Sequence, residues 1–103
     1  MTSRELLALR QAVRLHPANA LKRLRYAADL GGAGLHAQSE REFRILIERN
    51  PRETGARCGL GHVLASEGRK GEAIAAEQRA IALGGRHGDF WAGVELQKLT
   101  AGH

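Results

Sequence analysis

Residues 54–87 read TGARCGLGHVLASEGRKGEAIAAEQRAIALGGRH. Small and apolar residues recur at helical spacing on both sides of Gly68, and the stretch nowhere alternates with the period of two that a strand requires. Glycine ends helices readily because it reaches positive φ at little steric cost. The stretch therefore predicts two helices, near 53–66 and 70–83, joined by a tight turn at Gly68.

The helix-breaking residues of this stretch recur along the whole sequence at one constant interval. Pro17 and Pro51 lie 34 positions apart, and the next equal step reaches Gly85. The same interval separates further glycines and apolar residues: Gly34, Gly68 and Gly102; Val13, Ile47 and Ile81; Leu30 and Leu64. A fixed period of this length indicates a repeat architecture.

The positions of these breakers predict six helices, at 3–15, 20–31, 37–49, 53–66, 70–83 and 88–99. The residue before a proline is pushed out of the α region, so His16-Pro17 ends the first helix. Asp89 is the expected N-cap of the last one. Since aromatic residues make up 4% of the 103 residues and Ala, Leu and Arg dominate, the composition also favours an all-α protein.

A helix–turn–helix unit with this period resembles the tetratricopeptide repeat (TPR). Block 54–87 carries the family's motif at Leu60-Gly61, Gly68, Ala73 and Ala80; block 20–53 keeps Gly34, Phe43 and Pro51. The sequence departs from the pattern at Glu40, Glu77 and Gly85, which leaves a divergent α-solenoid as the alternative. The resemblance implies one domain, 1–103, built as a right-handed superhelix of antiparallel helix hairpins. It divides into a half repeat at 1–19, repeats at 20–53 and 54–87, and a half repeat at 88–103.

The resemblance also implies a concave groove lined by the first helix of each repeat. It places these residues there: Leu24, Ala28, Cys58, His62, Ala65, Ala92 and Leu96. Because this lining is small and apolar, the expected function is a non-enzymatic scaffold that binds a peptide or an amphipathic helix of a partner protein. Small residues also allow neighbouring helices to pack closely, an alternative that applies above all to Gly31, Gly55 and Ala92.

The last predicted helix has no following helix to cover it. In stacked repeats each unit buries its apolar stripe against a neighbour. Trp91, Val94 and Leu99 would then be exposed, and they are the expected contacts of a second hypothesis, self-association into a homo-oligomer.

Positive charge is concentrated near the N-terminus. The net charge is +5, and residues 1–34 hold six Lys or Arg against two Asp or Glu. The expected electrostatic residues, which would attract an acidic partner, are Arg10, Arg14, Lys22, Arg23 and Arg25. Nucleic acid is a weaker hypothesis, because Tyr26 is the one aromatic residue among them and its place in the repeat predicts burial.

Other classes of function have little support. Cys58 and His62 share a helix face, but they supply only half of the ligands of a structural zinc site, and no metal or cofactor is expected. Gly-Gly-Ala-Gly at 31–34 lacks the Lys-Ser/Thr of a phosphate-binding loop. No apolar run approaches the ~18 residues of a membrane span, so no membrane contact is expected. A single cysteine fits a cytoplasmic location, and 13 arginines against three lysines suggest a GC-rich bacterial genome.

Overall fold

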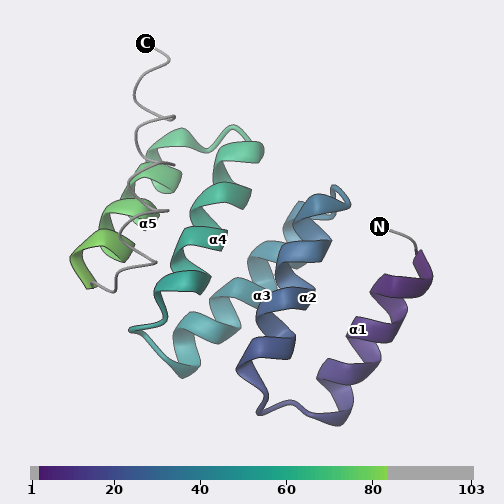
Figure 1. Ribbon diagram of the computed structural model, residues 1–103. Coiled ribbons are helices and arrows are strands. Elements are labelled where there is room, and N and C mark those ends of the chain that lie inside the picture. Colours follow the sequence, from purple (N-terminus) through teal and green to yellow (C-terminus); the bar gives the residue numbers. More distant parts are fainter. Residues whose placement is uncertain (1–2, 84–103) are drawn as a thin grey trace.

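The computed structural model describes residues 3–83, which form five α-helices. These are α1 (Ser3–Leu15), α2 (Ala20–Gly32), α3 (His36–Arg49), α4 (Thr54–Ser66) and α5 (Lys70–Leu83). Successive helices run in opposite directions and lie next to one another from α1 to α5 (Figure 1). The all-α prediction and its first five helices are confirmed; the sixth, at 88–99 with Asp89 as its N-cap, lies outside the described residues.

Two of the turns, at Gly34 and Gly68, are the same motif and lie one repeat period apart. These glycines have φ of 83° and 78°, in the left-handed region where glycine is favoured. After each, a backbone N–H reaches back to a leucine carbonyl, from Leu35 to Leu30 and from Arg69 to Leu64, both at 2.9 Å. This pairing is the Schellman motif, which satisfies the last carbonyls of a helix. The sequence predicted the turn but ended α2 one residue early, since Gly31 and Gly32 remain helical.

The other two turns, at 16–19 and 50–53, also repeat. In each, the residue before the proline donates its N–H to the carbonyl four positions earlier, at 3.0 Å for His16 and 2.9 Å for Asn50. A side chain then caps the next helix: Asn19 accepts from the N–H of Lys22, and Glu53 accepts from that of Gly55. Proline therefore ends α1 and α3, and the caps begin α2 and α4.

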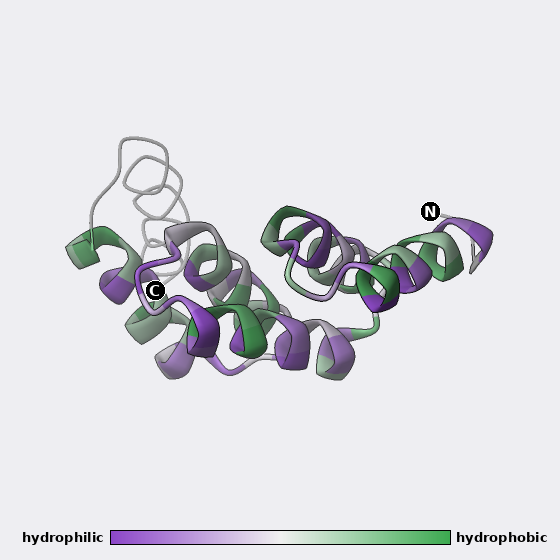
Figure 2. Ribbon diagram, turned by 90° about the horizontal axis from the view of Figure 1, so that it is seen from below, coloured by the Kyte–Doolittle hydropathy of each residue, from purple (hydrophilic) through white to green (hydrophobic). Residues whose placement is uncertain are grey.

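Two hydrophobic clusters hold the helices together. The larger joins α2, α3, α4 and α5 and consists of Ala27, Phe43, Leu46, Ala56, Leu60, Val63, Leu64 and Ala73. The smaller joins α1 to α2 through Val13, Tyr26 and Leu30, with Leu6 and Leu9 packed against it. Hydrophobic and hydrophilic residues accordingly occupy different sides of a helix (Figure 2). The attachment of α1 thus rests on the smaller cluster.

Helices that are two apart in the chain differ in whether they pack against each other. Besides its sequence neighbours α1 and α3, α2 packs against α4. Gly31 and Gly55 lie at this contact, where added Cβ atoms would sit 3.4 Å from a methyl carbon of Val63 and 3.6 Å from Leu24. Among the described helices, α1 and α3 make no such approach to each other. A surface opening is therefore left between α1 and α3, above α2.

Two polar residues are buried within the helix packing. Ser39 on α3 is fully buried and donates its hydroxyl to the carbonyl of Ala27 at 2.6 Å. Glu77 on α5 is also fully buried, and its carboxylate fills the space left by the missing side chain of Gly61 on α4. Each lies between the two helices of one predicted repeat, where a hydrogen bond satisfies Ser39 and a glycine makes room for Glu77.

None of the five described helices combines the length and the apolar composition needed to cross a membrane.

Candidate binding site

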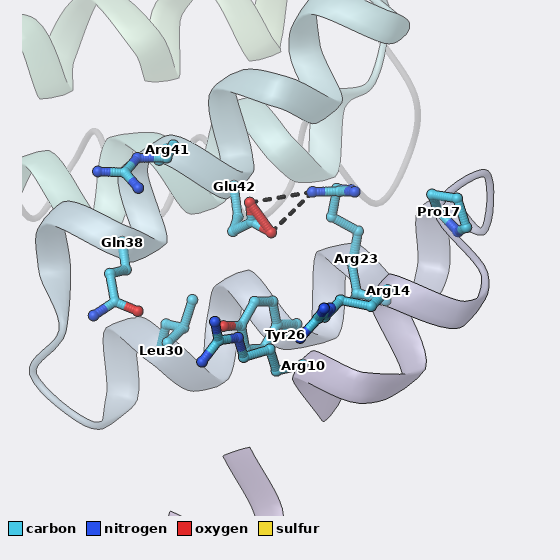
Figure 3. A pocket seen from close by; sticks show the side chains of 10 residues that line it. Arg10, Arg14, Pro17, Arg23, Tyr26, Leu30, Gln38, Arg41 and Glu42 are labelled. Atoms are coloured by element: carbon cyan, nitrogen blue, oxygen red, sulfur yellow. Dashed lines mark hydrogen bonds and ion pairs between the residues drawn. The ribbon is translucent and has the colours of Figure 1, made fainter. Parts of the chain in front are cut away.

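A cavity of about 540 Å³ opens between α1, α2 and α3 (Figure 3). It is lined by Arg10, Val13, Arg14, Pro17, Arg23, Tyr26, Leu30, Gln38, Arg41 and Glu42. The helical residues come in groups spaced three or four apart, so each helix contributes one face. We call this the arginine cavity.

The floor of the arginine cavity is apolar. Val13, Tyr26 and Leu30 are 5%, 8% and 2% exposed and form the smaller core cluster. Their packing fixes the distance between α1 and α2. The floor is therefore part of the hydrophobic core, and a ligand would meet mainly the side chains that surround it.

A largely buried ion pair joins α2 to α3 at one wall. Nη1 of Arg23 donates to both carboxylate oxygens of Glu42, at 2.9 and 3.1 Å (Figure 3). The two side chains are 10% and 13% exposed. Nε of Arg23 is buried without a hydrogen-bond partner in the described structure. Because the carboxylate already neutralises Arg23, this pair contributes structure and little net charge to the cavity.

Three further arginines give the cavity its charge. Arg10, Arg14 and Arg41 are exposed, and none of them takes part in an ion pair with any residue between 3 and 83. Arg14 lies in the last turn of α1, where a cation also stabilises the negative end of the helix dipole. The remaining positive charge faces solvent around an apolar floor, an arrangement that attracts anions.

Two arginines outside the cavity, Arg44 and Arg69, are paired with carboxylates. Arg69 contacts Glu40 at 2.7 Å and Glu72 at 2.6 Å, and Arg44 contacts Glu40 at 3.0 Å. Burial raises the pKa of Glu40, but the hydrogen bond from Arg44 and the charges of both arginines outweigh it and hold that pKa below its usual value. Hydrogen bonding and charge raise the pKa of Arg69. This network ties α3 to the α4–α5 turn.

The residues predicted for the concave groove lie on α2 and α4. Leu24, Cys58 and Ala65 are half-buried, whereas Ala28 and His62 are exposed. Leu24 and Ala65 pack against the larger core cluster. None of the five lines the arginine cavity or the two other cavities described, of about 400 and 230 Å³. Ala92 and Leu96 lie outside the described residues, so the groove stays a prediction.

The predicted electrostatic residues divide into two sets. Arg10, Arg14 and Arg23 come together at the arginine cavity, whereas Lys22 and Arg25 line none of the three cavities. The side chain of Arg25 is 76% exposed and lies 4.0 Å from Asp29, one turn further along the helix. The predicted self-association residues Trp91, Val94 and Leu99 are outside the described residues.

Sequence reasoning missed Gln38, Arg41 and Glu42, which supply the α3 wall. After residue 34 the numbers of basic and acidic residues are nearly equal, so counting charge along the chain did not single out Arg41. The sequence signal that could have placed Arg41 beside Gln38 is their spacing of three residues, which puts both on one face of a helix. Only the packing of α3 on α2 brings it near the arginines of α1.

Within residues 3–83, no three His, Cys, Asp or Glu side chains lie close enough together to hold a metal ion.

No protein-family model matches this sequence, and a search of the curated proteins finds no significant match.

Proposed function

We propose that this chain is a non-enzymatic protein–protein interaction scaffold, built from TPR-like helix hairpins that stack into a solenoid. Support for the repeat comes from the paired turns at Gly34 and Gly68 and from the proline turns at Pro17 and Pro51, with the same interval within each pair. Leu30 and Leu64 occupy the same place before their turns, and each is 2% exposed.

The arginine cavity is the observation that carries the proposed function. It combines a buried apolar floor with three exposed arginines that have no ion-pair partner within residues 3–83. An acidic segment of a partner protein complements this surface, since its carboxylates pair with guanidinium groups and its apolar side chains cover the floor. The partner-binding residues we propose are therefore Arg10, Arg14 and Arg41.

Nucleic acid fits this surface less well. Binding to single strands uses exposed aromatic rings on which the bases stack. Tyr26, the aromatic residue at the cavity, is only 8% exposed because it packs between α1 and α2 in the smaller cluster. The cavity thus offers positive charge without a stacking surface.

We further propose that the protein is cytoplasmic. The test is therefore to purify the chain from a native cell lysate in the presence of nuclease and to identify what is retained with it. The charge-reversal variant Arg10→Glu/Arg41→Glu is compared with Arg52→Glu, an exposed arginine that lines none of the three cavities. Both should keep the helicity and the melting temperature of the wild type, since all three arginines lie on the surface.

The proposal expects a protein that is retained by the wild type and by Arg52→Glu and lost from the double variant. Retention of the same protein by all three would show that the site lies elsewhere, for example in the predicted groove with Leu24 and His62. A nucleic acid that is released steeply with salt would replace the proposal with the nucleic-acid hypothesis. Recovery of the chain with only its own subunits would favour self-association.

A further inference from the structure

The arginine cavity continues into a second cavity of about 230 Å³. Both are lined by Arg10, Tyr26, Leu30 and Gln38, so they form one opening along α2. The second cavity adds three leucines, Leu6, Leu7 and Leu35. We call the two cavities together the α1–α3 groove.

The α1–α3 groove is apolar at one end and basic at the other. Along α1 the lining changes from Leu6 and Leu7 to Arg10 and then Arg14. The wall that faces it changes in the same direction, from Leu35 to Arg41. Leu7 and Leu35 are 63% and 41% exposed, so both present apolar surface to solvent at this end of the groove. The span from Leu6 to Arg14 is about 12 Å, or two helical turns.

We infer that the α1–α3 groove binds an amphipathic helix of an acidic partner protein, and that the N-terminal half of this helix is acidic and its C-terminal half apolar. The acidic half lies against Arg10, Arg14 and Arg41, and the apolar half against Leu7 and Leu35. The inference rests on the proposed function and adds the conformation and the direction of the bound segment.

The walls of the groove favour a helical ligand. Residues of α1, α2 and α3 form nearly all of its lining, and the backbone groups of a helix interior are already paired within the helix. An extended segment would find no strand edge here to satisfy its own backbone N–H and C=O groups. A helix satisfies those groups internally and presents side chains three and four residues apart along one face.

The direction follows from charge and from helix dipoles. Acidic residues stabilise the N-terminal end of a helix, so a segment with its carboxylates in that half forms a helix more readily than one with the two halves exchanged. With this half at Arg14, the bound helix runs opposite to α1 and α3, which run parallel to each other (Figure 1). The dipole of the bound helix then opposes those of α1 and α3 and is parallel to that of α2. A second copy of this chain is disfavoured as the occupant, because it carries a net charge of +5 toward a basic groove.

The experiment measures the binding of labelled synthetic peptides to the purified full chain by fluorescence anisotropy. The first peptide, of about 14 residues or four turns, carries three Glu on one face of its N-terminal half and three Leu on the same face of its C-terminal half. A second peptide has the two halves exchanged. A third has the same composition with the face scrambled.

Matched variants locate the site on the protein. Arg10→Glu/Arg41→Glu tests the basic end, with Arg52→Glu as its control. Leu7→Glu tests the apolar end, with Leu15→Glu as its control, because Leu15 is a similarly exposed leucine of α1, at 66%, that lines neither cavity. Circular dichroism checks that each variant keeps its helicity.

We expect the first peptide to bind the wild type and both controls equally, and to bind Arg10→Glu/Arg41→Glu and Leu7→Glu roughly tenfold more weakly. The exchanged and scrambled peptides should also bind roughly tenfold more weakly than the first. Equal binding of all three peptides, with sensitivity to the arginine variant alone, would overturn the inference and leave the proposed function standing. Binding that no variant alters would overturn both. A wild-type dimer that Leu7→Glu converts to a monomer would show that a second copy is the occupant, and would overturn the inference.

Discussion

Gly59 of α4 packs directly against the ring of Phe43 on α3. A Cβ atom placed on Gly59 would lie 3.0 Å from Cε2 of the ring and closer still to Cε1 and Cζ. The ring is 2% exposed and belongs to the larger core cluster, so its neighbours prevent it from moving aside. The absence of a side chain at this position thus sets how closely α3 and α4 approach.

Gly59→Ala should lower the free energy of unfolding by about 1–2 kcal/mol, since the cost of overpacking exceeds the gain in helix propensity. Gly71→Ala is the matched control: it lies in α5 and an added Cβ would meet nothing within 4 Å. That change should raise the free energy of unfolding by about 0.5–1 kcal/mol. Urea denaturation measures both. Equal stabilisation by the two substitutions would contradict the close packing of Phe43 on Gly59.

Glu42→Ala should lower the free energy of unfolding by about 2–3 kcal/mol, because it leaves the buried guanidinium of Arg23 without its carboxylate. The double variant Arg23→Met/Glu42→Leu should recover most of this loss, since it removes the charge together with its partner. Arg25→Ala, which breaks the exposed contact with Asp29, serves as a control and should cost less than about 0.5 kcal/mol. A double variant no more stable than Glu42→Ala would show that the pair stabilises the fold beyond mutual compensation.

Acid should destabilise the protein through Glu40. Its pKa is lower in the folded state than in the unfolded chain, so the folded state binds its proton less tightly. The stabilisation is therefore fully present above the unfolded pKa of about 4.3 and is lost as the pH falls through the folded pKa. Urea titrations between neutral pH and pH 3 should show a smaller loss for Glu40→Gln than for the wild type. Parallel curves for the two proteins would contradict the ion pairs with Arg44 and Arg69.

Leu30→Ala and Leu64→Ala remove side chains of equal burial, 2% exposed each, from the two different clusters. Each substitution should lower the free energy of unfolding of the helices around its own cluster by about 2–5 kcal/mol. In Leu30→Ala, hydrogen exchange should accelerate in α1 and the facing turns of α2 while α4 and α5 stay protected, because the smaller cluster holds α1. In Leu64→Ala, protection should fall in α2 to α5. Uniform loss of protection in both variants would show that the two clusters unfold as one unit.

The sequence predicted the five described helices well because the turns between them are set by local residues. Pro17 and Pro51 exclude the helical backbone before them, and Gly34 and Gly68 adopt the positive φ of the Schellman turn. Leu30 and Leu64, which the same period pairs, are both buried. These features depend on near neighbours in the chain and on one repeated unit.

The candidate site depends on packing between helices, and the sequence predicted less of it. Arg23 and Glu42 are 19 residues apart, whereas charges that pair on one helix are three or four residues apart. No local pattern therefore predicted that Glu42 neutralises Arg23. Arg41 joins Arg10 and Arg14 only because α3 docks on α2 in one register. The sequence did not predict the burial of Glu77 either, because glutamate is rarely buried. The space that its carboxylate fills is left by Gly61, which belongs to another helix.

The separate attachment of α1 gives the α1–α3 groove a thermodynamic consequence. One wall of the groove stands on the smaller cluster and the other on a helix that the larger cluster holds, so a ligand that touches both walls binds only molecules in which α1 is docked. By linkage, each tenfold excess of ligand over its Kd adds about 1.4 kcal/mol to the docking of α1. Conversely, the apparent affinity is reduced in proportion to the fraction of molecules in which α1 is docked. Val13 is buried beneath the groove. A substitution such as Val13→Ala would then lower the affinity for the partner by reducing the fraction of molecules in which α1 is docked.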